Sequence, residues 1–279
     1  MFAQNEIDNI IKEYTENYSS LAELSKIHNC TSGTIKKLLI SNQIKVRSRS
    51  EQTKYTNMKR AKTCDDNYFS NIDSVNKAWL LGFLASDGTV RAERNEMKIG
   101  LSSIDREILE KIKEELKISR NISDYITNNG FSVSELIWTS AQQKNDLAKY
   151  SIVPNKTYIN FHLPHFDNKN YTLAYILGYI DGDGSISVSK ENYLRIRIVS
   201  YQENILNDII RFLQENYQIT YSLSKNRDIY ELSISTQYAK TILKDMYNLG
   251  SLHLNRKYQK YLEWKNQETS TSSKDEKIC

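Results

Sequence analysis

Two stretches of this chain share one pattern, AWLLGFLASDG at residues 78–88 and AYILGYIDGDG at residues 174–184. Each is apolar on nearly every side of a helical projection, which is typical of a helix buried inside a protein. The copies are 96 residues apart (174 − 78 = 96), and each is followed by the same succession of sequence features. The duplication predicts a domain of two similar halves, each organised around one buried helix.

Two pairs of equivalent glycines indicate how these helices pack and end. Gly82 and Gly178 lie inside the helices, where glycine costs about 1 kcal/mol relative to alanine. Because this cost is incurred at both positions, we expect a close crossing of the two helix backbones, which a Cβ atom would prevent. Gly88 and Gly184 are expected to end the helices in the left-handed conformation.

Asp87 and Asp183 immediately precede those last glycines, so pairing of the helices would bring two carboxylates together. Neighbouring carboxylates repel each other unless protons or cations intervene, and the negative end of a helix dipole adds to the repulsion. Hard oxygen ligands without His or Cys favour Mg²⁺, which can promote phosphodiester hydrolysis. For one copy alone, a carboxylate that hydrogen-bonds its own helix end is the simpler interpretation. The duplication favours a shared metal site.

The segments that follow each copy predict the same elements in the same order. Alternating residues indicate strands, helical spacing indicates amphipathic helices, and polar turns indicate hairpins. In the first half these segments are 89–101, 105–116, 122–139 and 140–150, and in the second half 185–200, 203–213, 220–235 and 236–247. We expect two αββαββα repeats, at residues 75–165 and 166–266, and a disordered polar tail at 267–279.

Residues 1–50 predict a separate small helical domain. Apolar spacing indicates three helices within residues 5–46, the second capped by Ser19 or Ser20 and the third by Ser32. The turn before the third helix and a β-like Ile-Lys-Val ending resemble a helix-turn-helix, although an ordinary three-helix bundle fits the same spacing. The face that would enter a major groove then carries Ser32, Thr34, Lys36 and Lys37.

Positive charge is concentrated after this domain. The chain has 38 Lys and Arg against 34 Asp and Glu, a net charge of +4, but residues 36–62 hold nine cations and one anion, a net charge of +8. Such a block commonly binds polyanions, and the alternative is a solvated linker. We expect Arg47 and Arg49 to contact DNA and residues 51–74 to form a basic and polar linker.

The composition argues against membrane and secreted proteins. No apolar run approaches the roughly 20 residues of a membrane span, and the N-terminus lacks the features of a secretory signal. The three cysteines fit neither a zinc site nor a disulfide framework. A reducing, cytoplasmic setting is the expectation.

Residues 80–88 and 176–184 resemble the LAGLIDADG motif of homing endonucleases, in the single-chain form with two motifs. The resemblance covers about residues 75–265. It implies an α+β fold in which the motif helices form the interface of two pseudo-symmetric halves, with saddle-shaped antiparallel sheets over the DNA major groove. The resemblance also implies that the eighth motif residue, here Asp87 and Asp183, binds metal and that the seventh, here Ser86 and Gly182, contributes a backbone carbonyl. The first motif departs at its sixth position, which is alanine and not aspartate.

The family also places a lysine from each half near the scissile phosphates, and the best matches are Lys156 and Lys257. They follow the acids by similar distances (156 − 87 = 69 and 257 − 183 = 74). Arg256 competes with Lys257 for this role, and each lysine could instead be an ordinary surface residue. Cations on or near the predicted strands would contact DNA; they are Arg91, Lys98, Lys190, Arg195, Arg197, Lys225 and Arg227.

These observations predict a monomeric, Mg²⁺-dependent endonuclease that breaks both strands of a long site in double-stranded DNA. Two alternatives stay open on the same scaffold. One is a DNA-binding regulator that has lost cleavage, and the other is an RNA maturase that assists intron splicing. The retention of both eighth-position acids argues against the regulator.

Overall fold

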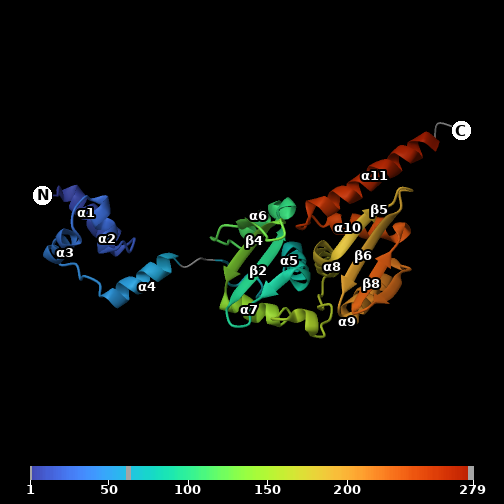
Figure 1. Cartoon of the computed structure of the whole chain (residues 1–279), viewed down its shortest axis with the longest axis horizontal. Helices are drawn as coiled ribbons and strands as arrows, with labels where there is room; N and C mark the ends of the chain where they lie inside the picture. Colours follow the sequence, from blue (N-terminus) through green and yellow to red (C-terminus); the bar gives the residue numbers. More distant parts are fainter. Residues whose placement is uncertain (1, 61–63, 276–279) are drawn as a thin grey trace. The chain divides into compact units, whose positions relative to one another are not determined.

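The computed structural model describes residues 2–60 and 64–275 (Figure 1). The chain divides into two compact units, residues 1–61 and 62–279, and each has its own hydrophobic core. No helix among the described residues has both the length and the hydropathy needed to cross a membrane.

The first unit contains the three predicted helices and a fourth. These are α1 (Gln4–Thr15), α2 (Leu21–Ile27), α3 (Ser32–Ser41) and α4 (Arg49–Arg60). The core of the unit consists of Ile10, Tyr14, Leu24, Ile35 and Leu39. Ser20 caps α2, as expected, but the cap of α3 is Thr31, whose hydroxyl accepts from the amide of Thr34 at 3.1 Å.

Helix α4 replaces part of the expected linker, and the Ile-Lys-Val segment before it is not a strand. A reciprocal pair of hydrogen bonds begins this helix: the Ser48 amide donates to Glu51 at 2.7 Å, and the Glu51 amide donates to the Ser48 hydroxyl at 3.2 Å. This Ser-x-x-Glu capping box is visible in the sequence. The remaining part of the expected linker also differs, because Tyr68 and Phe69 are buried in the core of the second unit.

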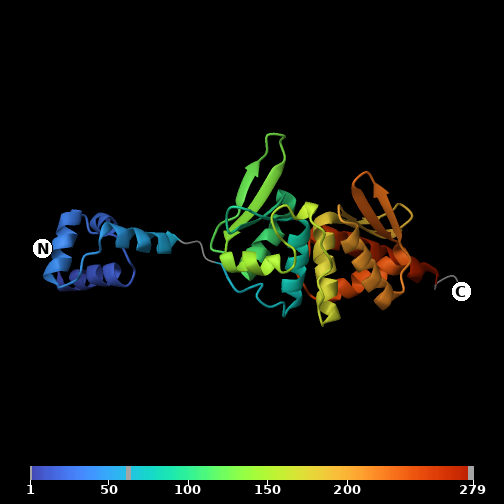
Figure 2. The ribbon, with the colours of Figure 1, turned by 90° about the horizontal axis from the view of Figure 1, so that it is seen from below.

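The second unit contains the two predicted halves, each with a four-stranded antiparallel sheet. The first sheet has the order β1 (Gly88–Val90), β2 (Glu96–Ser102), β4 (Ser132–Thr139), β3 (Ser123–Ile126). The second has the equivalent order β5 (Gly184–Val188), β6 (Leu194–Ser200), β8 (Ile229–Ile234), β7 (Ser222–Asn226). Figure 2 shows the β3–β4 and β7–β8 hairpins extending from the same side of this unit.

Helices cover the inner faces of both sheets. The motif helices are α5 (Val75–Ser86) and α8 (Lys169–Asp183), which lie side by side between the sheets (Figure 1). The others are α6 (Arg106–Glu115), α7 (Ala141–Ala148), α9 (Glu203–Tyr217), α10 (Thr236–Asn248) and α11 (Asn255–Asp275), with short 3-10 turns at η1 (Ser103–Asp105) and η2 (Lys156–Tyr158). The predicted α+β fold with two pseudo-symmetric repeats is confirmed.

The crossing of α5 and α8 is as close as the glycines predict. A Cβ atom on Gly82 would overlap the backbone carbonyl of Tyr175, and one on Gly178 would overlap the carbonyl of Trp79. Both obstacles are backbone atoms of the opposite helix, so a side chain at either glycine would force the helices apart.

Gly88 and Gly184 are not left-handed, contrary to the expectation. Gly184 is extended (φ −106°, ψ 176°), and each glycine is the first residue of a strand. A Cβ atom would lie 2.6 Å from the Leu84 carbonyl at Gly88 and 2.7 Å from the Ile180 carbonyl at Gly184. These glycines therefore allow each strand to begin close to the end of its helix: α8 is followed directly by β5, and a single turn residue, Asp87, separates α5 from β1.

The expected disordered tail is helical as far as Asp275, as the continuation of α11. The earlier part of this helix is anchored to the second half: Tyr261 and Trp264 are buried, and the Trp264 indole donates to the Asn192 carbonyl at 3.2 Å. Because extending an existing helix is much easier than starting one, the polar residues that follow continue it. Residues 276–279 lie outside the described residues.

Candidate metal and nucleic-acid site

The two motif helices end beside each other, and each ends in an aspartate. Asp87 is the C-cap of α5, and Asp183 is the last residue of α8. A Cβ atom on Gly182 would overlap the side chain of Ser86, so the two ends are in contact. Burial raises the pKa of Asp87, and burial together with the charge of Asp87 raises the pKa of Asp183 to about 6. The two carboxyl groups therefore lie close enough for the charge of Asp87 to act on Asp183.

Two lysine ammonium groups, one partly buried and one buried, bind the ends of these helices. Lys156, the first residue of η2, donates to the carbonyls of Ser86 at 2.8 Å and Gly88 at 2.7 Å. Lys257, in the first turn of α11, donates to the carbonyls of Ile180, Asp181 and Gly184 at 2.6–2.7 Å. Each lysine thus binds the motif helix of its own half, which supports the equivalence inferred from their spacing.

The charges of these two lysines balance the negative groups at the junction. Cations at a helix C-terminus interact favourably with its dipole, and here they also face the two acids. Burial lowers the pKa of Lys156, and it lowers the pKa of Lys257 to about 8, while the neighbouring aspartates oppose both shifts. With a pKa of about 8, Lys257 is therefore mostly protonated at neutral pH.

The two halves use their lysines differently. The carbonyl of Ser86, expected to be a metal ligand, already accepts from the Lys156 ammonium. The carbonyl of Gly182 is its equivalent in the second half, and Lys257 donates to three other carbonyls instead. The positions at which a cation could bind are thus unequal in the two halves.

Arg256 does not share the role of Lys257. Its Nε donates to both carboxylate oxygens of the buried Asp105, at 2.8 and 3.1 Å. This ion pair links α11 of the second half to η1 of the first, since Asp105 ends η1. The geometry therefore favours Lys257 over Arg256 as the counterpart of Lys156.

The first motif has Ala85 where the second has Asp181, and this difference changes a hydrogen bond at a distance from the acid pair. Asp181 is fully buried; one oxygen accepts from the Trp79 indole at 2.9 Å and from the Leu254 amide at 3.1 Å. In the other half, alanine replaces this aspartate and Tyr175 replaces Trp79. Within the described part of the chain, the buried Tyr175 hydroxyl has no hydrogen-bond partner. The substitution thus removes an interface hydrogen bond but leaves the acids in place.

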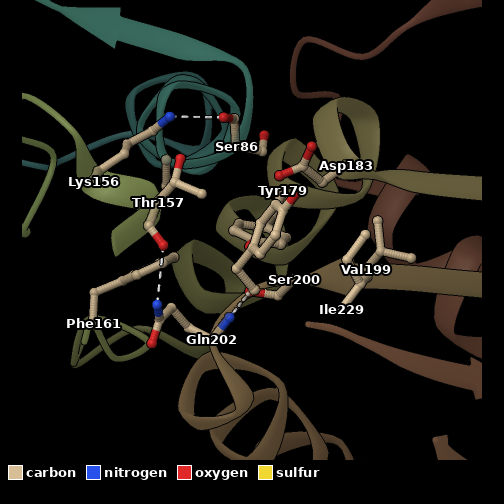
Figure 3. A pocket seen from close by; sticks show the side chains of 12 residues that line it. Ser86, Lys156, Thr157, Phe161, Tyr179, Asp183, Val199, Ser200, Gln202 and Ile229 are labelled. Atoms are coloured by element: carbon tan, nitrogen blue, oxygen red, sulfur yellow. Dashed lines mark hydrogen bonds between the residues drawn. The ribbon is translucent and has the colours of Figure 1, made fainter. Parts of the chain in front are cut away.

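A pocket opens beside Asp183 between the two halves (Figure 3). Its lining includes the polar residues Ser86 and Lys156 and the aromatic residues Phe161 and Tyr179. At its edge Gln202 donates to the carbonyl of Thr157 at 3.0 Å, which joins α9 to η2. The sequence gives no local signal of this pocket, because its walls come from segments that are distant along the chain and carry no shared motif.

The predicted cations of the second unit lie on the outer sheet faces and their turns, but several already have partners. Lys98 pairs with Glu135, Arg197 with Glu231 and Arg91 with Glu96, and Lys225 donates to the Tyr230 hydroxyl. Lys190, Arg195 and Arg227 are exposed. The structure therefore gathers these residues on surfaces that solvent reaches, with glutamates interspersed among them.

In the first unit, the predicted face of α3 is exposed, whereas Arg47 is turned inward. Thr34, Lys36 and Lys37 face solvent. The Ser32 hydroxyl contacts α2, donating to Ser25 at 3.2 Å. The Arg47 guanidinium donates to the carbonyls of Tyr14 and Ser19 and lies 3.8 Å from the centre of the Tyr14 ring. Arg47 therefore stabilises this unit, while Arg49 remains exposed at the start of α4.

Replacing Lys257 with methionine is expected to destabilise the second unit by about 2–4 kcal/mol, since a buried group loses three charge-assisted hydrogen bonds. Lys156→Met, which removes two such bonds from a more accessible group, should cost less. Thermal unfolding of both variants measures this order. Lys260→Met, at an exposed position of the same helix, is the control. Equal melting temperatures for Lys257→Met and the control would contradict the helix-binding role.

The comparison with protein families agrees with this architecture. The family described as a LAGLIDADG-like domain matches residues 74–150 and 170–246, which together form more than half of the chain. Each match contains one motif helix and the sheet that follows it. The chain therefore belongs to the LAGLIDADG-like domain family, in the form with two copies.

Two curated relatives come from Methanocaldococcus jannaschii. The DNA-directed RNA polymerase subunit Rpo1C is 27% identical over 164 residues, and the match covers 58% of this chain and 18% of that protein. The chain thus spans less than a fifth of that relative's length. The uncharacterized protein MJ0314 is 25% identical over 195 residues, covering 68% of this chain and 69% of that protein.

Among solved structures, similar chains include the LAGLIDADG meganuclease I-AabMI bound to uncleaved DNA (14% identity, TM-score 0.47, covering 70% of this chain and 91% of that chain). The homing endonuclease I-WcaI bound to its DNA recognition sequence has 10% identity and a TM-score of 0.48, covering 79% and 96%. Full-length DUF199/WhiA from Thermatoga maritima has 14% identity and a TM-score of 0.47, covering 77% and 71%.

Proposed function

We propose that this chain is a metal-dependent endonuclease that cuts both strands of double-stranded DNA at a specific site. The observation that carries the proposal is the meeting of Asp87 and Asp183 at the ends of two crossing helices, where burial raises the pKa of both. Holding two carboxylates together in this way costs stability, and a bound cation would offset the cost. The outward cations of the sheets provide a surface that suits a polyanion.

The donor set at the junction fits Mg²⁺. Within residues 2–60 and 64–275, no group of three or more His, Cys, Asp or Glu side chains forms a metal site. The proposed ligands are the carboxylates of Asp87 and Asp183 and the carbonyl of Gly182, all hard oxygen atoms. The metal would supply Lewis-acid stabilisation of the phosphodiester oxygens. The two lysines keep the helix ends in place and add positive charge beside the position of the phosphate.

The second candidate is a DNA-binding protein in which cleavage is impaired or lost, as in a regulator, and one specific contact favours impaired cleavage. The ammonium of Lys156 donates to the Ser86 carbonyl, so a cation already lies against one expected metal ligand. If that ammonium does not move, one of the two centres lacks this ligand. The protein would then bind DNA and nick one strand at most.

The deciding experiment uses a duplex that spans the chain's own genomic locus without the element that encodes it. With Mg²⁺, the full chain is expected to convert this duplex into two fragments, and with EDTA it should leave the duplex intact. Nicked product alone would indicate one active centre. A retarded band with no cleavage in Mg²⁺ or Mn²⁺ would support the regulator and contradict the endonuclease.

Removing residues 1–61 is expected to weaken DNA binding and flatten its salt dependence. Exposed cations of the first unit, such as Lys36, Lys37 and Arg49, would neutralise phosphates, and each such contact steepens the dependence of log K on log salt by about one. Binding titrations at several salt concentrations, with the full chain and with residues 62–279, measure the two slopes. Equal slopes would mean that the first unit binds a different partner.

A further inference from the structure

A cation and a glutamate are paired on neighbouring strands of each sheet. In the first sheet, Lys98 Nζ lies 2.7 Å from Glu135 Oε1, between β2 and β4. In the second, Arg197 Nε lies 3.5 Å from Glu231 Oε1, between β6 and β8. The side chains of the second pair are about two-fifths exposed (43% and 42%), and those of the first are less so (28% and 14%).

The strand register shows that the two cations are equivalent. Gly88 pairs with Ile99, and its counterpart Gly184 pairs with Ile198. Lys98 and Arg197 immediately precede those two isoleucines, so they occupy the same position in their sheets.

The glutamates are equivalent by the same reasoning. Leu136 is the partner of Ile99, and Leu232 is the partner of Ile198. Glu135 and Glu231 each precede these leucines by one residue and are 96 residues apart (231 − 135 = 96), the offset of the two motifs. The chain has therefore kept a cation–glutamate pair at matching places in both halves.

These pairs lie on the faces of the sheets that point away from the motif helices. On β2, Lys98 alternates with the buried Met97 and Ile99, and on β6, Arg197 alternates with the buried Ile196 and Ile198. Around the second pair, a groove is lined by Arg195, Arg197, Ser222, Glu231 and Ser233 among others. The groove therefore presents hydrogen-bond donors and acceptors from three adjacent strands.

We propose that each pair reads one G·C base pair from the major groove, an inference that rests on the proposed DNA-binding function. The major-groove edge of G·C offers the acceptors O6 and N7 on guanine and the N4 donor on cytosine. A cation beside a carboxylate is complementary to that edge: Lys98 or Arg197 donates to guanine, and Glu135 or Glu231 accepts from cytosine.

The glutamates distinguish base reading from simple attraction to the backbone. An electroneutral pair releases no net counterions from DNA, and its carboxylate repels phosphates. Such a pair adds little to affinity for arbitrary DNA, but it penalises any base pair that places a hydrogen-bond acceptor against the carboxylate. These residues therefore act on specificity.

The pseudo-symmetry of the halves adds a geometric requirement. The two G·C pairs should lie at equal distances from the centre of the target and in inverted orientation, because the residues that read them are equivalent. Arg197 can form two parallel hydrogen bonds to guanine, whereas Lys98 acts as a point charge. The preference for guanine is therefore expected to be stricter in the half-site read by the second sheet.

Selection from a library of randomised duplex DNA, in EDTA to withhold metal, tests this inference with the full chain. The wild type should enrich inverted G·C pairs at matched distances from the centre. Glu135→Gln should lose the preference at one of them and Glu231→Gln at the other, each by about tenfold. Both variants should also bind arbitrary DNA with a salt slope steeper by about one, because the freed cation can contact a phosphate.

Glu110→Gln is the matched control, since Glu110 pairs with Arg106 at 2.7 Å on α6 and its side chain has the same exposure as that of Glu231. Unchanged base preferences in Glu135→Gln and Glu231→Gln would overturn this inference and leave the proposed function intact. A lower melting temperature in these variants would then show that the pairs only stabilise the sheets. If the wild type enriches no sequence, site-specific DNA binding fails, and this inference fails with it.

Discussion

Replacing Asp183 with asparagine is expected to abolish double-strand cleavage and, without metal, to stabilise the protein. Burial and the charge of Asp87 raise the pKa of Asp183 from 3.8 to about 6. At neutral pH this carboxylate is ionised in a place that disfavours its charge. Asparagine keeps the shape of the side chain, removes the charge and cannot replace a carboxylate as a strong Mg²⁺ ligand.

The same pKa difference predicts how stability depends on pH. Between pH 3.8 and 6 the native state holds a proton on Asp183 that the unfolded state has released. Stability from this group is therefore complete below pH 3.8 and is lost as the pH rises through 6. The difference corresponds to about 3 kcal/mol, which Asp183→Asn should regain at pH 7.5. Asp87→Asn should act in the same direction, because burial also raises the pKa of Asp87.

Denaturant unfolding in EDTA at pH 5 and pH 7.5 measures this effect, and the duplex-cleavage assay measures activity. The control is Asp167→Asn, because Asp167 has a fully exposed side chain in the connection between the halves. If Asp183→Asn were less stable than the wild type at pH 7.5, the carboxylate would be a stabilising helix-end hydrogen bonder. That role is the simpler interpretation of the aspartate in each motif. Cleavage retained in both Asp183→Asn and Asp87→Asn would support the same interpretation.

Local sequence patterns predict a large part of this architecture. Residues that repeat at an interval of 96 and keep the periodicity of helices and strands predict the two halves, their sheets and the buried motif helices. Gly82 and Gly178 predict the crossing, because glycine destabilises a buried helix unless a neighbouring backbone needs the space of its missing side chain. The Ser48–Glu51 capping box is also a local signal of α4, although the polar composition of that segment favours a linker.

Contacts between distant segments were not predictable from such patterns. Alternation along a strand places Lys98 and Arg197 on an outer face, but only the register shows that Glu135 and Glu231 lie beside them. Similarly, Lys156 could be matched to Lys257 by spacing, yet its contact with the Ser86 carbonyl depends on the path of the chain around η2. Periodicity contains no information about which strand or loop becomes a neighbour.

The interior position of Arg47 and the extended conformation of Gly184 show a second limit. A basic residue in a basic segment is expected to contact DNA, and a glycine at a helix end is expected to end the helix in the left-handed conformation. Tertiary packing overrides both expectations. Arg47 donates to two backbone carbonyls and lies against an aromatic ring, and a Cβ atom at Gly184 would overlap the Ile180 carbonyl of the preceding helix.

Gly178→Ala is expected to prevent the second unit from folding or to lower its stability by more than about 4 kcal/mol. The added methyl group would overlap the Trp79 carbonyl and lie 2.9 Å from the amide of Phe83, both in the backbone of α5. Backbone in a buried helix cannot move aside as a flexible side chain can, so the helices must separate along their length. Separation would open the core that both halves share and would pull the two acids apart.

The position of the tryptophans allows this loss to be assigned to one unit. All three of them, Trp79, Trp138 and Trp264, belong to the second unit, so indole fluorescence reports on that unit alone, whereas far-ultraviolet circular dichroism reports on both. Gly178→Ala should lose the cooperative fluorescence transition but keep a helical signal from residues 1–61, whose core is separate.

Gly33→Ala is the matched control for this experiment. Gly33 is also a helical glycine, but a Cβ atom there would meet only the Thr31 hydroxyl at 3.6 Å, so alanine should be neutral or stabilise α3 by up to about 1 kcal/mol. The same substitution thus has opposite expected effects at two glycines, and the difference comes entirely from what lies opposite each Cβ. A fluorescence transition unchanged in Gly178→Ala would mean that α5 and α8 do not cross at these glycines. Without that crossing, the meeting of Asp87 and Asp183, on which the proposed chemistry depends, would have no structural basis.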